Sequence, residues 1–322
     1  LFQFIPKTTQ SRTRMTEKPL EASSRGVDGS NRVEQGKDRD TDLPIPLLGV
    51  QTPRIHTPLN DLPSRGGDLI DLAASLGVDL MEWQKFALIH THKYKPDGRW
   101  ASPTNCIVVA RQNGKSFLQQ IRILGGLFLW DEPLQIGQAH TLNTSLEQFR
   151  QMMWTIEANE SLAKQVKKVR LNHGAEEIET KMGTRFMVRA GGSAARGISR
   201  PSTIHLDELL RMNNMDSYAS LRYTLMAAPN PMLMGYTNAG DNTSVVLNSF
   251  RDRAMASIGG VIDDIAYFEW SSPTDEITLE NARHANPAMG VTIHEDNIRS
   301  VLNDPPNVVM SEVLCRWVVA IQ

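Results

Sequence analysis

The sequence predicts an α/β fold in which helices cover both faces of a mostly parallel central sheet. Short apolar runs that indicate buried strands alternate along the chain with segments of helical periodicity. Gly114, Asp207 and Thr237 each come just after the end of one such run. Because ligands bind beyond the carboxyl ends of the strands in such sheets, we expect these three positions to meet in one site.

The expected elements follow from the spacing of the apolar residues. From about residue 68 to residue 89 these residues recur at helical intervals, and further helices are expected at 115–129, 144–157, 217–227 and 245–256. Buried strands are expected at 104–110, 134–139, 203–206, 232–236 and 260–268. Three shorter strands, at 166–171, 177–180 and 185–189, indicate a meander, and three short helices are expected to close the chain.

The composition limits the classes to which the chain can belong. Its 322 residues and 40% apolar content allow a substantial core, and a formal net charge of −2 gives no overall basic field for nucleic acid. Cys106 and Cys315 lack metal-binding spacing and fit a reducing compartment, while His90 and His92 indicate packing or surface roles. No apolar run is long enough for a membrane-spanning helix, and the first residues lack a signal-peptide profile.

The first 45 residues are expected to form a disordered N-terminal tail. They contain many charged, Ser and Gly residues and too few apolar residues to offset the entropy lost on ordering. The chain begins with Leu1, and the segment that opens at Met15 indicates a natural start near that residue.

The segment Cys106-Ile-Val-Val-Ala-Arg-Gln-Asn-Gly-Lys-Ser116 indicates a buried strand that leads into a phosphate-binding loop and the N-terminus of a helix. Val109 stands where the full pattern has its first Gly, so only Gly114-Lys115-Ser116 is intact. Gly114 allows the main chain to approach a ligand closely, and the backbone N–H groups of the loop are expected to wrap the phosphates of ATP.

The residues of this loop have separate expected roles. Lys115 is expected to neutralise the β- and γ-phosphate oxygens, and Ser116 to place its hydroxyl on Mg²⁺. Gln112 and Asn113 contribute backbone N–H groups to the phosphate-binding loop. Arg111 is either a surface residue or, as we favour, a further cation over the phosphates in a loop tightened by the loss of the first Gly.

A second segment, Ser202-Thr-Ile-His-Leu-Asp-Glu208, is an apolar run that ends in two adjacent carboxylates. Asp207 is expected to hold Mg²⁺ through water, and Glu208 to activate the water that attacks the γ-phosphate. Each segment alone occurs often by chance. The order of the two segments, the distance between them and the apolar run before each motif all fit one ATP site. Together the two segments predict an ATPase.

Two other segments suggest additional parts of an ATP site. The amide of Gln84 can pair with both edge groups of adenine, whereas Trp83 is expected to pack in the core. Arg196, or else Arg200, lies on a segment of small residues that could present an arginine finger to the γ-phosphate of a neighbouring subunit. Packing of the loop or contact with a DNA phosphate is an almost equally good interpretation of these arginines.

Taken together, these segments resemble the large terminase subunit of tailed bacteriophages. The resemblance runs from about residue 65 to the C-terminus and also includes Tyr236-Thr-Asn-Ala-Gly240 and Ala285-Asn-Pro-Ala-Met-Gly290. It implies a P-loop NTPase fold of the additional-strand, catalytic-glutamate type and an ATP-hydrolysing motor that moves double-stranded DNA into a procapsid. By the same resemblance, Arg111 belongs to a deviant phosphate loop, Arg196 is a finger that acts in trans, and Thr237 and Asn238 couple hydrolysis to DNA movement.

The resemblance also implies a division of the chain and a set of partners. An ATPase domain is expected at 46–265, followed at 266–322 by a helical linker or lid region that leads in the family to a nuclease domain, which this chain does not reach. The implied partners are double-stranded DNA, a portal protein, the small terminase subunit and further copies in a homo-oligomeric ring. The implied location is the cytoplasm of the infected bacterial host, with no membrane association and no place in the mature virion.

Two other functions compete with this interpretation. A DNA or RNA helicase-like ATPase also combines an adenine-reading Gln with a phosphate loop, but it needs a second ATPase-like domain, which nothing after residue 240 indicates. A non-hydrolysing, nucleotide-dependent assembly protein is the alternative from another class, and the intact Lys115, Ser116, Asp207 and Glu208 argue against it.

A basic cluster, Lys164, Lys167, Lys168 and Arg170, is either a track for DNA or a solvated face.

Overall fold

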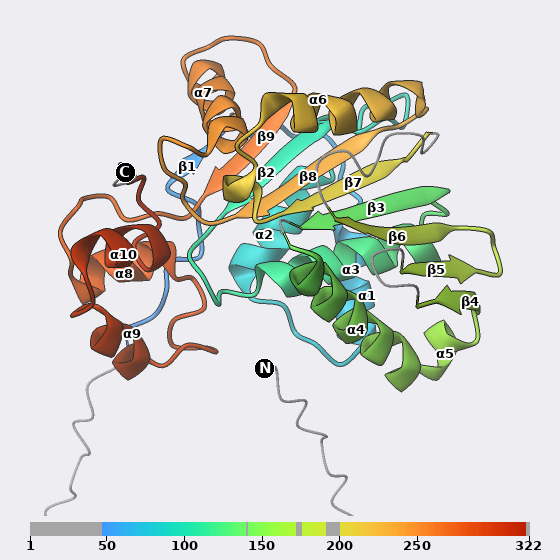
Figure 1. The fold of residues 1–322 in the computed structure, drawn as a ribbon, viewed down its shortest axis with the longest axis horizontal. Coiled ribbons are helices and arrows are strands. Elements are labelled where there is room, and N and C mark those ends of the chain that lie inside the picture. The colour runs from blue at the N-terminus through green and yellow to red at the C-terminus, as the bar shows by residue number, and fades with distance from the viewer. Residues whose placement is uncertain (1–46, 140, 172–175, 191–199, 320–322) are drawn as a thin grey trace, which may run out of the picture. The chain divides into compact units, whose positions relative to one another are not determined.

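The computed structural model describes residues 47–139, 141–171, 176–190 and 200–319. Within them a nine-stranded sheet forms the centre of the fold (Figure 1). From one edge to the other its strands are β1 (Ile55–His56), β9 (Ile265–Glu269), β2 (Thr104–Val108), β8 (Met232–Thr237), β7 (Thr203–Asp207), β3 (Leu134–Ala139), β6 (Arg185–Ala190), β5 (Glu177–Thr180) and β4 (Val166–Arg170).

The strands from β9 to β6 run parallel to one another, which confirms the prediction of a mostly parallel sheet. β1 pairs antiparallel with β9, and β4, β5 and β6 form the predicted antiparallel meander. β8 lies between β2 and β7, so one additional strand separates the strand before the phosphate loop from the strand that ends in Asp207. Val108 is level with Thr237, and Tyr236 is level with Asp207, so the carboxyl ends of the three strands lie side by side.

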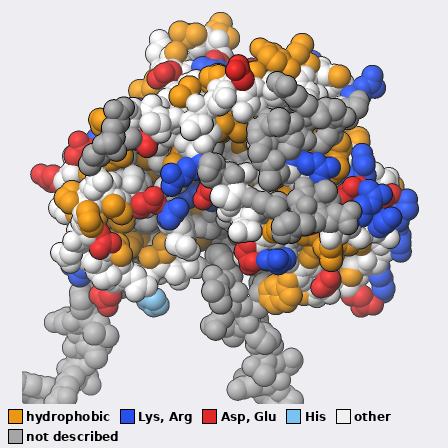
Figure 2. Space-filling view, in the orientation of Figure 1, with side chains coloured by type: hydrophobic (Ala, Val, Ile, Leu, Met, Phe, Trp, Pro, Cys, Tyr) orange, Lys and Arg blue, Asp and Glu red, His pale blue; other side chains and the backbone are white. Residues whose placement is uncertain are grey.

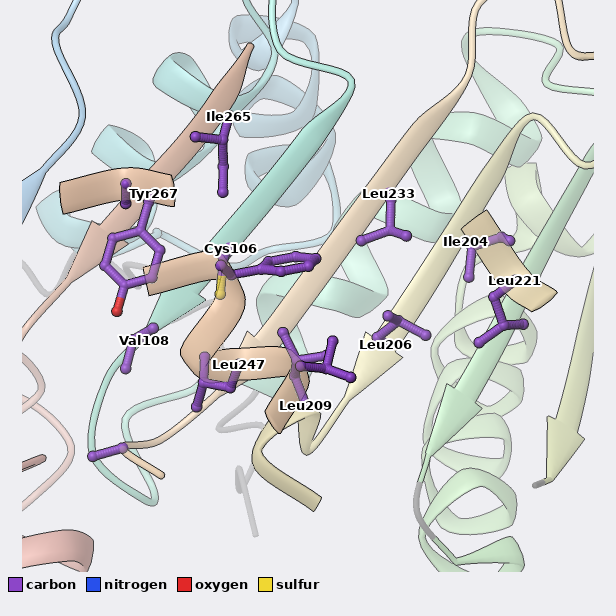
Figure 3. Packing of buried hydrophobic residues seen from close by; sticks show 14 of the residues in the cluster. Cys106, Val108, Ile204, Leu206, Leu209, Leu221, Leu233, Leu247, Ile265 and Tyr267 are labelled. Carbon is purple, nitrogen blue, oxygen red and sulfur yellow. The ribbon is translucent and has the colours of Figure 1, made fainter. Parts of the chain in front are cut away.

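Helices cover both faces of the sheet, and the side chains of its central strands are buried on both sides. One face carries α6 (Met215–Thr224) and α7 (Val245–Ile258), and the other carries α1 (Gly66–Ser75), α2 (Glu82–Thr91), α3 (Lys115–Phe128) and α4 (Leu142–Ala158) (Figure 1). Along β2, Cys106 and Val108 pack in the core under α6 and α7, whereas Ile107 packs in the core under α1 to α3. Figure 3 shows the first of these cores, with Leu247 of α7 over the strands.

The short helices α8 (Leu279–Ala285), α9 (Glu295–Val301) and α10 (Pro306–Glu312) follow the last strand, as expected. They share a small apolar core of their own. The short helix α5 (Glu160–Ala163) follows α4, and 3₁₀ turns lie at Leu209–Arg211 and Leu225–Ala227. Within the described ranges, no helix is both long and apolar enough to cross a membrane.

Several predicted boundaries shift in the structure. The strand expected at 260–268 begins only at Ile265, because the Asp263 carboxylate binds Arg253 and accepts a hydrogen bond from the Ile265 N–H. The expected domain boundary after residue 265 therefore falls within β9. The helix expected at 144–157 begins earlier, since the Thr141 hydroxyl caps it by accepting from the Thr144 N–H.

The predicted packing roles are confirmed. Trp83 is fully buried, with its ring 5.3 Å from the ring of Trp270. His92 is buried beside Trp100 and Trp130, and the ring of His90 packs on Phe86. Residues 1–46, which include the whole of the predicted tail, lie outside the described residues.

A buried ion pair fixes the helix that follows the phosphate loop. Arg122 of α3 is completely buried and lies 2.6 Å from a carboxylate oxygen of Glu132, just before β3. Its guanidinium also donates to the Thr203 hydroxyl at the start of β7, and it lies 4.9 Å from the Trp130 ring. The orientation of α3 relative to β3 and β7 therefore depends on one buried charge pair.

We expect Glu132→Ala to lower the free energy of unfolding by about 3–5 kcal/mol, because it leaves the Arg122 charge buried without its counter-ion. Urea denaturation followed by circular dichroism measures this change. The control is Glu160→Ala, which removes a carboxylate from an exposed pair with Lys164 and should cost less than about 1 kcal/mol. Similar losses in the two variants would contradict the role given to the buried pair.

Candidate functional site

The loop between β2 and α3 folds around the amine of its own lysine. The Lys115 Nζ donates to the carbonyl oxygens of Val109 at 2.7 Å and Ala110 at 2.9 Å. Gln112 and Gly114 have positive φ angles of 64° and 96°, which turn the chain tightly into α3. No side chain caps α3 at Gly114, which leaves the first N–H groups of the helix without a capping side chain, as at helix N-termini that bind anions.

The environment of Lys115 disfavours its charged form. Burial lowers the pKa of Lys115 from 10.5 to about 8, although the nearby carboxylates of Asp207 and Glu312 act in the opposite direction. A phosphate group beside the amine would add to the effect of these carboxylates and favour the charged form of the amine. The loop therefore has the properties of an anion site built around one partly desolvated cation.

The packing of Val109 accounts for the absence of the first Gly of the usual phosphate-loop pattern. Its side chain is fully buried in the core with Trp83 and Leu118, and its N–H donates to the Thr237 carbonyl oxygen. A Gly at this position would leave a gap in the core. The positive φ angles that the turn needs occur later in the loop, at Gln112 and Gly114.

The side chain of Asn113 ties the loop to the segment after α8. It is buried, its Nδ2 donates to Ala110 O and to Asn286 Oδ1, and its Oδ1 accepts from the Ala288 N–H. Asn113 thus fixes the loop through its side chain, and only its backbone is available for phosphate.

Gln84 supports the same loop from the other side. Its Oε1 accepts from the Met81 N–H at 3.0 Å, which caps α2, and its Nε2 lies 3.5 Å from the Gly114 carbonyl oxygen. The side chain is almost completely buried. In this arrangement the Gln84 amide bonds to backbone, so the adenine-reading role stays a prediction.

The two predicted carboxylates lie at the end of β7. Asp207 accepts a hydrogen bond from the Gln148 amide of α4, and burial raises the pKa of Asp207. Glu208 has a positive φ of 51°, an unusual backbone conformation for a residue with a side chain. Glu208 lines a cleft of about 240 Å³ whose walls also include Gln138, Asp207, Arg211, Asn214 and Ser217.

Thr237 and Asn238 connect the end of β8 to both neighbouring segments. The Thr237 hydroxyl accepts from the Leu210 N–H, two residues after Glu208, and donates to the carbonyl oxygen of Asn238. The Asn238 Nδ2 donates to Glu312 Oε2 at 3.2 Å. These two adjacent residues therefore link the segment after Glu208 to α10.

The remaining predicted site residues, Arg111, Ser116, Arg196 and Arg200, are exposed or lie outside the described residues. Arg111 is 57% exposed and forms an ion pair of 2.8 Å with Glu312. Ser116 is exposed at the start of α3. Arg196 lies outside the described residues, and Arg200 is exposed with a positive φ of 56°.

Sequence reasoning missed two side chains that contact the predicted site, Gln148 and Glu312. The helical periodicity of 144–157 marks the apolar face of α4, and it gives no signal for a polar contact with a strand end. Glu312 comes from a short C-terminal helix with no motif of its own.

The predicted basic cluster lies on and beside β4, at the edge of the sheet. Lys164 pairs with Glu160, Lys167 with Glu179 and Arg170 with Glu177. Figure 2 shows basic and acidic side chains interleaved over this end of the molecule. These pairings lower the positive field of the cluster, so its contact with DNA stays a prediction.

Solved structures with a similar fold come from bacteriophages. The large terminase of bacteriophage HK97 is 19% identical, with a TM-score of 0.66 over 79% of this chain and 55% of the terminase. The large terminase of a thermophilic bacteriophage is 11% identical, with a TM-score of 0.53 over 76% of this chain and 55% of the terminase. The chain has the fold of these phage terminases over about half of their length. The predicted α/β fold with a mostly parallel central sheet is confirmed. Neither a scan of protein-family models nor a search of curated proteins found a match.

Replacing the partly desolvated lysine should change the pH dependence of stability. Because the pKa of Lys115 is about 8 in the folded chain and 10.5 ordinarily, the charged amine lowers stability below pH 8. This loss disappears as the pH rises from about 8 to 10.5. We expect Lys115→Met to be more stable than wild type at pH 7 and to lose most of that advantage by pH 10, as measured by urea denaturation.

The matched control is Lys168→Met, which removes an exposed amine on β4. Its difference from wild type should not change over the same pH range. A Lys115→Met variant with a pH-independent difference from wild type would contradict the lowered pKa.

Proposed function

We propose that this chain is the ATP-hydrolysing part of a large terminase subunit, the motor that translocates double-stranded DNA into a procapsid. The observation that carries the proposal is the level arrangement of three strand ends. It brings the Lys115 loop, the Asp207–Glu208 pair and the Thr237–Asn238 pair to one edge of a sheet with a terminase fold. Nuclease activity, which the resemblance assigns to a later domain, is not proposed for this chain.

The residues at this edge fit ATP and Mg²⁺. The partly desolvated amine of Lys115 and the uncapped N-terminus of α3 both favour bound phosphate. Ser116 and Asp207 offer the hydroxyl and carboxylate oxygens that Mg²⁺ prefers, and Arg111 offers a second cation. When bound, ATP supplies the phosphoanhydride bond whose hydrolysis releases the free energy for movement.

The catalytic roles divide between the segments. We assign to Glu208 the orientation and deprotonation of the attacking water, because it lines an open cleft at the strand ends, beside the partly buried Asp207. Thr237 and Asn238 are proposed to couple this step to DNA movement, since they bond to the segment after Glu208 and to α10.

The wider assembly is part of the same proposal. The partners are double-stranded DNA, a portal protein, the small terminase subunit and further copies in a ring, and the place of action is the cytoplasm of an infected bacterial host.

Arg196 is proposed to act on the ATP of a neighbouring copy. Mixing Arg196→Ala chains with Glu208→Gln chains tests this role, because each chain supplies the residue that the other lacks. No recovery of activity in the mixture would contradict it.

Two substitutions should separate nucleotide binding from turnover. Lys115→Ala removes the cation of the loop and should weaken ATP binding by about 10–100-fold, as measured by calorimetry. Glu208→Gln should retain ATP binding while lowering kcat by about 10²–10⁴-fold, because only the attacking water loses its base. An equal loss of ATP affinity in both variants would contradict the division of roles.

Stimulation of hydrolysis by DNA tests the proposed motor function itself. The rate of ATP hydrolysis should rise when double-stranded DNA is added, and the stimulation should fall steeply with salt. Glu208→Gln with the same DNA is the control for contaminating ATPases. ATP binding without hydrolysis under any condition would favour the assembly protein, and ATP-dependent strand separation would favour the helicase.

A further inference from the structure

A polar side chain of α4 contacts the acidic end of β7. The amide Nε2 of Gln148, in the second turn of the helix, donates a hydrogen bond to Asp207 Oδ2. The amide Oε1 of Gln148 takes no part in this contact. The orientation of the Asp207 carboxylate therefore depends on a helix that carries none of the nucleotide-binding motifs.

The packing of α4 holds Gln148 in place. The adjacent residue, Phe149, is buried in a core that also contains Phe186 of β6. Further along α4, the Thr155 hydroxyl accepts from the Gln120 amide of α3 at 2.5 Å. Because the backbone around Gln148 is already fixed against the sheet and α3, little conformational entropy is lost when its side chain acts on a ligand.

Gln148 also lies beside the second residue that we propose as a metal ligand. A small pocket between α3 and α4, with a volume of about 20 Å³, includes Ser116, Gln119 and Gln148 in its walls. This volume is enough for one water molecule. Gln119 is buried, and its Oε1 has no hydrogen-bond partner among the described residues. Gln148 therefore contacts Asp207 and shares a polar pocket with Ser116.

The chemistry of Mg²⁺ gives both ends of the Gln148 amide a use. In proteins this ion usually keeps several of its waters and takes only one or two ligands from side chains. The retained waters donate hydrogen bonds and need acceptors. An amide is both donor and acceptor, so Gln148 can hold a carboxylate ligand with its Nε2 and accept from a metal-bound water with its Oε1.

We propose that Gln148 is a positioning residue of the Mg²⁺ site, which orients Asp207 and accepts a hydrogen bond from a water on the ion. This inference rests on the proposed function, because it takes Ser116 and Asp207 as the residues that hold the metal. In this role Gln148 acts on the ion and not on the nucleotide. Its loss therefore weakens only the part of nucleotide binding that depends on Mg²⁺.

The test measures the affinity of a slowly hydrolysed ATP analogue by calorimetry, once with saturating Mg²⁺ and once with EDTA. Gln148→Met keeps a side chain of similar length but removes its donor and acceptor. The affinity in EDTA should stay as in wild type, while the gain in affinity on adding Mg²⁺ should fall by about 10-fold, as is typical when an outer contact of a metal site is lost.

The matched control is Gln165→Met, between α5 and β4. Gln165 is also partly buried and donates one hydrogen bond, to the Ser161 carbonyl oxygen, far along the chain from the motifs. Its gain in affinity on adding Mg²⁺ should equal that of wild type. The affinity of Gln148→Met in EDTA shows in addition whether the nucleotide site of that variant is intact.

An unchanged gain in Gln148→Met, or an equal loss of affinity with and without Mg²⁺, would overturn this inference while the proposed function stands. A crystal structure of the wild-type chain with Mg²⁺ and the analogue gives a second readout, which does not depend on the folding of a variant. Gln148 Oε1 should lie about 3 Å from a metal-bound water, and an amide turned away from the ion would overturn the inference. A folded wild-type chain that binds the analogue neither with nor without Mg²⁺ would overturn the proposed function as well.

Discussion

The register of β2, β8 and β7 is the constraint on which the rest of the site depends. Val108 pairs with Thr237 and Tyr236 pairs with Asp207 in the sheet. The carboxyl ends of the three strands therefore lie side by side, and with them the phosphate loop, the acidic pair and the Thr237–Asn238 pair. Side chains alternate between the two faces of a strand. A slip of one residue in the pairing would therefore move every side chain of that strand to the opposite face of the sheet. The two apolar cores on either side of β2 oppose such a slip, and so the packing of the sheet fixes the geometry of the site.

The phosphate loop is held by side chains on several sides. Val109 anchors it in the core, Asn113 ties it to Asn286 and Ala288, and the amine of Lys115 binds two of its carbonyl oxygens. The contacts of Asn113 come from the segment after α8, so this C-terminal segment forms part of the candidate site. In the proposed motor, such contacts would connect hydrolysis at the loop to a part of the molecule that moves.

The sequence predicts the features of this site that depend on local pattern. An apolar run followed by Gly114-Lys115-Ser116, and another followed by Asp207-Glu208, identify strand ends because burial and chain direction are both visible in consecutive residues. The contacts of Gln148 with Asp207 and of Glu312 with Asn238 join residues 59 and 74 positions apart. No local pattern encodes such pairings. The start of β9 was predicted too early because Asp263 bonds to the backbone of the chain just after it.

The most direct test of this account is a crystal structure of the chain with Mg²⁺ and a slowly hydrolysed ATP analogue. We expect the phosphates at the N-terminus of α3, with the Lys115 amine moved from the Val109 and Ala110 carbonyl oxygens toward them. The metal ion is expected between Ser116 and Asp207. A nucleotide bound at another edge of the sheet, with the Lys115 contacts unchanged, would contradict the account.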